Sequence, residues 1–97
     1  MKVTICQFNP AEDTLDQALD RLSEHLVKHS SDFLLLPEMC FAQWLAADPV
    51  PDPQAWQDAV AKHEARIADL RDLGVGAVVG TRPMIRENGS RRNQAYV

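Results

Sequence analysis

The strongest indication of the fold is the stretch Ser31-Asp32-Phe33-Leu34-Leu35-Leu36-Pro37-Glu38. Its apolar run does not alternate with polar residues, and Pro37 ends it, which is typical of a short strand covered on both faces. Such strands occur in parallel sheets, in which helices connect one strand to the next. We therefore predict an α/β chain in which residues 32–36 form an internal strand.

The residues before this stretch predict another strand and a helix. Residues 2–8 are rich in β-branched and apolar types and stop at Asn9-Pro10, a turn signal. Thr14 and Gln17 form a capping box at the start of an apolar pattern. Four leucines then follow at helical spacing: Leu15, Leu19, Leu22 and Leu26. We expect an amphipathic helix over residues 14–29.

The residues after the stretch predict a second helix behind a connector rich in proline, residues 47–51. Asp52 is placed to cap this helix, and Pro53 suits its first position. An apolar stripe follows, formed by Trp56, Val60, Ile67 and Leu70. Gly74 suits a left-handed cap at the carboxyl end, so the predicted helix runs over residues 53–73.

The last quarter of the chain predicts strands. Residues 75–80 form an apolar run, and Asn88-Gly89 indicates a type I′ hairpin between residues 82–87 and 91–97. The predicted order is β-α-β-α-β-β, with three parallel strands closed by an antiparallel ribbon. Two helices cover one face of such a sheet, so we expect an exposed apolar face unless further chain or a partner subunit supplies a layer.

Length and composition bound the class of protein. The chain has 97 residues, 45% of them hydrophobic and 25% charged, which fits one small globular domain, residues 1–97. Because residues 93–97 stop inside the predicted strand over residues 91–97, with no turn or polar tail after them, we expect this domain to be incomplete, the N-terminal part of a longer protein.

Charge and cysteine content indicate which partners and which cellular compartment suit the chain. The net charge of −4 argues against nucleic acid or an anionic membrane as partner. Four arginines lie near the predicted hairpin, and we interpret them as solvated surface: Arg82, Arg86, Arg91 and Arg92. Cys6 and Cys40 form no disulfide framework, and no signal peptide or membrane span is evident, so we expect a cytoplasmic protein.

The sequence offers one candidate catalytic residue, Glu38. A carboxylate directly after a buried parallel strand lies at the sheet edge where α/β folds gather ligands, and apolar neighbours disfavour its charged form. Such a glutamate can act as a general base. From the residue alone, an ordinary turn or capping role is the alternative.

Other titratable residues have simpler interpretations. His25 and His29 lie one turn apart with no evident third ligand, so we expect surface histidines and no metal site. His63 falls on the apolar stripe and is expected to be a hydrogen-bonded residue at the core boundary. Cys40 lies two residues from Glu38, but beside Phe41 a packed thiol is favoured over a nucleophile.

A combination of segments points to a family. In chain order these are KVTICQFNP (residues 2–10), a helix, SDFLLLPE (31–38), VVGT (78–81) and RNQAYV (92–97). In this order they resemble the N-terminal portion of the nitrilase superfamily of carbon–nitrogen hydrolases. The resemblance covers essentially the whole chain, and its most specific element is the strand ending in Leu-Pro-Glu. It implies a four-layer α-β-β-α sandwich, assembly as a homo-oligomer, and no metal or organic cofactor.

The resemblance also implies a reaction. In the family, a cysteine thiolate attacks an amide, carbamoyl or nitrile carbon to form a thioester, a glutamate serves as base and then acid, and a lysine stabilises the developing negative charge. Glu38 matches the glutamate. The family's lysine and cysteine come after the strand that ends here at Val97, so we expect the 97 residues alone to be inactive. The alternative is a non-catalytic α/β module that dimerises or binds a protein partner through its sheet face.

Overall fold

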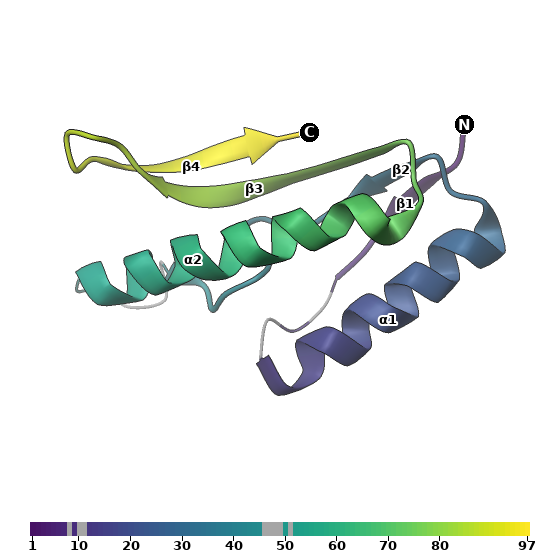
Figure 1. Cartoon of the computed structure of the whole chain (residues 1–97), viewed down its shortest axis with the longest axis horizontal. Helices are drawn as coiled ribbons and strands as arrows, with labels where there is room; N and C mark the ends of the chain where they lie inside the picture. The colour runs from purple at the N-terminus through teal and green to yellow at the C-terminus, as the bar shows by residue number, and fades with distance from the viewer. Residues whose placement is uncertain (8, 10–11, 46–49, 51) are drawn as a thin grey trace.

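Strands and helices alternate along the chain, as the sequence predicts (Figure 1). The computed structural model describes residues 1–97 apart from residues 8, 10–11, 46–49 and 51. In chain order its elements are β1 (Val3–Ile5), α1 (Glu12–His29), β2 (Phe33–Leu35), α2 (Pro53–Asp69), the 3-10 helix η2 (Leu70–Leu73), β3 (Ala77–Ile85) and β4 (Arg91–Tyr96). The predicted order β-α-β-α-β-β and the α/β class are confirmed. Pro10 and most of the predicted connector over residues 47–51 lie outside the described residues.

The four strands form one sheet in the order β1-β2-β3-β4. β1 pairs parallel with β2, and β2 pairs parallel with β3, with Ile5, Leu35 and Val79 in register. β4 runs antiparallel to β3. The predicted parallel sheet closed by an antiparallel ribbon is therefore correct. β3 is one continuous strand of nine residues that joins the predicted strand over residues 75–80 to the first arm of the hairpin.

The ends of α2 follow the predicted signals. Asp52 accepts hydrogen bonds from the backbone N–H groups of Gln54 and Ala55 at 3.0 and 3.2 Å, and Pro53 begins the helix. The α-helix ends at Asp69, one turn of 3-10 helix follows, and Gly74 takes the left-handed conformation with φ 73°. Both the cap at the start and the glycine at the end are confirmed.

Two local predictions are wrong. α1 begins at Glu12, so Thr14 lies inside the helix and is not its cap. The hairpin is not a type I′ turn, because Gly89 has a positive φ of 81° and Asn88 does not. The N–H of Gly89 bonds to the carbonyl of Arg86, and the N–H of Arg86 bonds to the carbonyl of Ser90. This three-residue loop ends in a left-handed glycine, an arrangement that follows the right-handed twist of the strands as well as the two-residue turn does.

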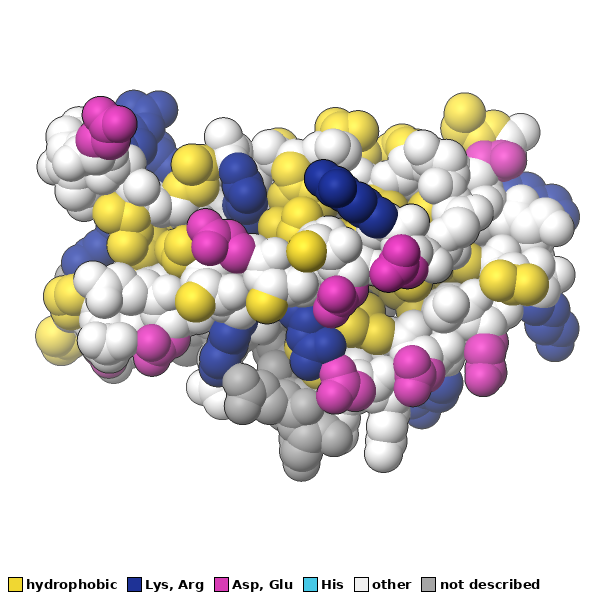
Figure 2. All heavy atoms as spheres, in the orientation of Figure 1, with side chains coloured by type: hydrophobic (Ala, Val, Ile, Leu, Met, Phe, Trp, Pro, Cys, Tyr) yellow, Lys and Arg dark blue, Asp and Glu magenta, His cyan; other side chains and the backbone are white. Residues whose placement is uncertain are grey.

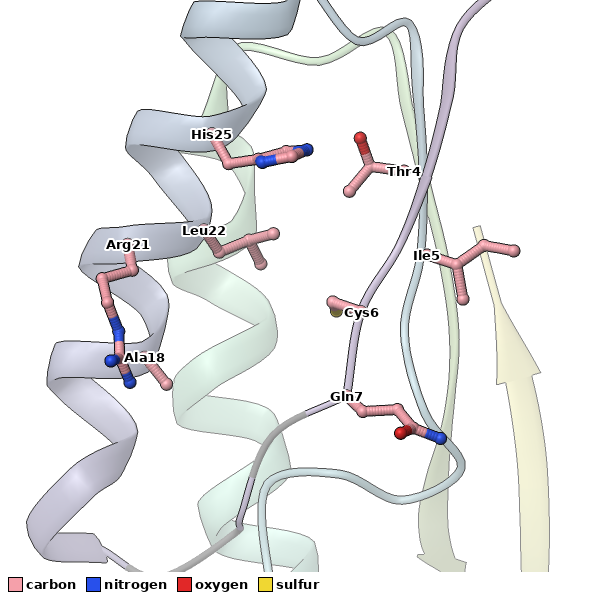
Figure 3. A pocket seen from close by; sticks show the side chains of 8 residues that line it. All are labelled: Thr4, Ile5, Cys6, Gln7, Ala18, Arg21, Leu22 and His25. Atoms are coloured by element: carbon pink, nitrogen blue, oxygen red, sulfur yellow. The ribbon is translucent and has the colours of Figure 1, made fainter.

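Both helices lie on the same side of the sheet (Figure 1). The core lies between them and the strands, and its buried members are Leu15, Leu22, Leu26, Leu34, Leu36, Cys40, Phe41 and Leu70. Figure 3 shows Thr4 of β1 and Cys6, directly after β1, pointing toward α1, whereas Ile5 points away from the helix. Strand alternation therefore divides the sheet into a helix-covered face and a second face.

The second face of the sheet is open. Val3, Ile5 and Leu35 lie on it and expose 53%, 72% and 38% of their surface. The expected exposed apolar face is confirmed. The expectation that residues 32–36 are covered on both sides is not met, because the described part of the chain supplies helices to one side only.

Charged side chains are spread over the helical layer, and hydrophobic side chains are visible between α2 and the β3–β4 hairpin (Figure 2). Arg66 of α2 contacts Asp16 of α1 at 2.6 Å, a surface pair of small energetic value. On the hairpin, Arg82 donates to the side chain of Gln94, and Arg91 lies 5.9 Å above the ring of Trp56. These two arginines thus contact the protein's own side chains.

Gly80 makes room for Tyr96, which lies opposite it on β4. A Cβ at Gly80 would lie 2.5 Å from the Tyr96 hydroxyl and 2.7 Å from ring atom Cζ. We expect Gly80→Ala to lower the free energy of unfolding by about 1–3 kcal/mol, measured by urea denaturation. In a Tyr96→Val background the same substitution should cost less, and an equal cost in both backgrounds would rule out this contact as the cause.

Candidate functional site

The candidate site is the segment that follows β2, residues 36–42, which we call the Glu38 loop. Leu36 still donates its N–H to the carbonyl of Val79 at 2.9 Å, as a continuing strand would. Pro37 then ends the strand, because proline has no N–H to donate. Glu38 therefore lies directly beyond the carboxyl end of a central parallel strand, where the sequence places it.

Side chains from three elements hold the Glu38 loop. The N–H of Met39 donates to Oγ1 of Thr81 on β3 at 2.9 Å. The N–H of Phe41 donates to Nε2 of His63 on α2 at 3.2 Å. On β4, Nδ2 of Asn93 donates to Oε1 of Glu38 at 2.5 Å. A loop without secondary structure of its own is thus bound to the helix and to both strands of the hairpin.

The backbone of the loop adopts a conformation that needs such support. Met39 has φ 42°, in the left-handed region that a residue with a side chain disfavours by roughly 1–2 kcal/mol. Four consecutive side chains of the loop are nevertheless buried: Met39, Cys40, Phe41 and Ala42. Their burial and the hydrogen bond to Thr81 fix this turn, which directs Glu38 away from the core.

The loop spans both faces of the sheet. Strand alternation from the Ile5–Leu35–Val79 register places Thr81 and its neighbour across the strands, Ala95, on the open face, together with Asn93. Phe41 belongs to the core on the helix-covered face. Glu38 therefore meets Asn93 on the side of the sheet that the helices leave open.

Glu38 itself is exposed. The expected apolar surroundings are not met within the described residues, because the four buried residues that follow turn inward while the carboxylate turns outward. What the structure does give Glu38 is an orienting donor, the amide of Asn93. Sequence reasoning assigned Asn93 no role, although Asn93 belongs to the segment RNQAYV that carries the resemblance and to the strand whose register the hairpin loop sets.

The thiols are not activated. Cys40 is 5% exposed, and burial raises its pKa to about 12, with a smaller contribution from the nearby Cys6. Burial also raises the pKa of Cys6. Both groups are therefore protonated thiols at neutral pH, and the interpretation of Cys40 as a packed residue agrees with the structure.

This state of the thiols can be measured. We expect Cys40, in a Cys6→Ser variant, to react with a disulfide reagent at pH 7 more slowly than Cys6 does in a Cys40→Ser variant, because it is more deeply buried. Both should react more slowly than free cysteine, and the unfolded chain serves as the control. A Cys40 that reacts faster than free cysteine would identify an activated nucleophile instead.

The lysines and remaining histidines lie away from this arrangement or have other partners. Lys2 precedes β1, at the amino end of the parallel strands and so at the opposite edge from Glu38, while Lys28 and Lys62 are exposed on the helices. His25 and His29 are exposed, with ring centroids 4.3 Å apart. Across the residues that the structure describes, no three metal-ligating side chains come together.

His63 differs from its prediction in burial. It is hydrogen-bonded, as expected, but it is 1% exposed and lies in the interior, not at the core boundary.

Two further features of the described structure are a pocket beside β1 and a buried hydroxyl group. A cavity of about 290 Å³ lies between β1 and α1, lined by Thr4, Cys6 and His25 among others (Figure 3). The hydroxyl of Tyr96 is buried with no hydrogen-bond partner among the described residues.

Comparison of the chain with protein-family models, with curated proteins and with solved structures finds no match. None of the helices in the described ranges is both long and apolar enough to cross a membrane. The fold and the Glu38 loop therefore carry the functional argument.

Proposed function

We propose that this chain is the glutamate-bearing N-terminal part of a nitrilase-like carbon–nitrogen hydrolase. The observation that carries the proposal is the place of Glu38: directly beyond a central parallel strand, in a loop held by three elements, with its carboxylate bound by Asn93. The element order and the Leu-Pro-Glu strand end agree with the resemblance. Glu38 would take the proton of a cysteine thiol that attacks the substrate and return it to the leaving amine.

The reaction class follows from the chemistry of such a base. A thiol attacks the carbon of a non-peptide amide or carbamoyl group, and a thioester forms as the protonated amine leaves. With a nitrile the thiol adds to give a thioimidate, which one water converts to the thioester with release of ammonia. A further water then cleaves the thioester, releasing the acid and regenerating the thiol. The lysine that stabilises the anionic intermediate and the nucleophilic cysteine would come from residues after Val97 in a longer protein. No metal or organic cofactor is required by this scheme, and the cytoplasmic setting is part of the same proposal.

The exposure of Glu38 and the open sheet face are explained together by this proposal. In the four-layer sandwich that the resemblance implies, a second sheet packs against the face that carries Val3, Ile5 and Leu35. Because Asn93 lies on the same face, we expect this layer to shield Glu38 from water as well, which would favour proton transfer near neutral pH. Helix pairing would join such subunits in a homo-oligomer.

The alternative function is a non-catalytic module, and the same open face favours it. An exposed apolar face of a sheet is also what a dimerising or partner-binding domain presents. The two functions differ in turnover. The protein encoded by the full reading frame should release ammonia from a panel of small amides, carbamoyl compounds and nitriles if it is a hydrolase. A folded full-length protein without any such activity would favour the module.

A further inference from the structure

His63 is buried with both of its ring nitrogens in use. Nδ1 lies 2.7 Å from the carbonyl of Ala59, one turn earlier in α2, and Nε2 lies 3.2 Å from the N–H of Phe41. The Phe41 N–H can only donate, so Nε2 must be the unprotonated acceptor. Nδ1 then carries the proton and donates it to Ala59. One tautomer of the neutral ring satisfies both partners, and a protonated ring cannot accept from Phe41.

An apolar side chain would fit the helical pattern at this position equally well. The ring of His63 packs edge-on against that of Phe41, with centroids 5.5 Å apart, so it occupies the place of a core residue. What the imidazole adds is an acceptor for a backbone N–H in the Glu38 loop. Replacing the imidazole with an apolar side chain would delete this hydrogen bond, and losing a hydrogen bond is costly in a protein interior.

Nearby charged groups are not the cause of the lowered pKa of His63. Burial is the main reason that its pKa is lowered, and backbone hydrogen bonds alone oppose the change. Its neighbours along α2, Lys62 and Glu64, are exposed, and Cys40 in the packed loop is a neutral thiol below pH 7. Glu38 turns toward Asn93 on the open face.

We infer that His63 is a positioning residue for Glu38. Thr81 holds the centre of the turn at Met39, and His63 holds its exit at Phe41, so the two bonds together set the direction in which Glu38 leaves the turn. The positioning is a property of the chain as it stands. Its importance for catalysis rests on the proposed function.

The test uses nuclear magnetic resonance on the 97-residue chain. We expect a through-hydrogen-bond coupling between the Phe41 nitrogen and Nε2 of His63. In His63→Leu, the Phe41 amide should lose about ten-fold or more of its protection from hydrogen exchange, the effect of about 1.4 kcal/mol. The side-chain amide signals of Asn93 should shift in the same variant, because its partner Glu38 moves.

Rescue separates positioning from simple packing. The side-chain oxygen of glutamine can accept a hydrogen bond, so His63→Gln should restore part of the Phe41 protection and return the Asn93 signals toward their original positions. His25→Leu, which changes an exposed histidine, is the matched control and should alter neither. Unchanged Phe41 exchange and Asn93 signals in His63→Leu would overturn the inference.

The effect of pH provides a test without any substitution. The folded-state pKa of His63 lies below the ordinary value of 6.5, so the bond to Phe41 is fully present above pH 6.5 and weakens as pH falls through the folded-state pKa. As pH falls below 6.5, protection of the Phe41 amide from hydrogen exchange should decrease. Protection of the Leu36 amide, which is bonded to Val79, should persist. Equal behaviour of both amides would contradict the inference.

The results also distinguish this inference from the proposed function. If Phe41 and Asn93 respond to His63→Leu but Glu38 proves dispensable for turnover, the positioning stands and the hydrolase proposal fails. If they do not respond, the positioning fails whatever Glu38 does.

Discussion

Glu38→Gln should reduce turnover by the proposed hydrolase by about 10²–10⁴-fold or more. Glutamine keeps the shape of the side chain and retains an oxygen that accepts from Asn93, so the loop should keep its geometry. What it loses is the ability to take a proton from the attacking thiol. The measurement is the rate of ammonia release at saturating substrate, compared with the unaltered protein.

The control for this prediction is Glu87→Gln, which removes an equal charge from the exposed hairpin loop. It should leave turnover unchanged. Substrate binding should survive in Glu38→Gln, because the role assigned to this residue is proton transfer and not substrate recognition. If Glu38→Gln turned over substrate as fast as Glu87→Gln, Glu38 would not be the base.

Of the substitutions considered for stability, Phe41→Ala should lower the free energy of unfolding most, by about 3–5 kcal/mol. Phe41 is 1% exposed, belongs to the core on the helix-covered face and packs against His63. Its truncation would leave a cavity where the Glu38 loop joins the core. The midpoint of urea denaturation of the 97-residue chain measures the effect.

Phe33→Ala is the matched control, because Phe33 is half-buried on the open face of β2. The same atoms are removed, but less surface returns to water, so the loss should be clearly smaller. Equal losses at the two positions would mean that the core does not extend to the Glu38 loop as described.

Local patterns predict the elements of this fold where the signal acts within a few residues. Asp52, Pro53 and Gly74 act on the ends of α2 through backbone conformation and hydrogen bonds to adjacent residues, and all three are confirmed. The prediction that Thr14 caps the first helix is wrong for a related reason. A capping pattern marks where a helix can begin, and here the helix starts one half-turn earlier, at Glu12.

The candidate site is harder to predict, because its contacts join residues far apart in the sequence. Position after a strand is enough to place Glu38 at the sheet edge. The partners of its loop are separated from it by 22, 42 and 55 residues: His63, Thr81 and Asn93. Helical periodicity describes His63 as one more residue of an apolar stripe, and only tertiary packing shows which backbone group it accepts from.

The proposal that this chain belongs to a nitrilase-like hydrolase is tested by determining the reading frame beyond codon 97 in the source gene. We expect the frame to continue and to encode a lysine shortly after β4 and a cysteine further on, the two groups that would act together with Glu38. A stop codon directly after Val97, or a continuation lacking either residue, would rule the proposal out.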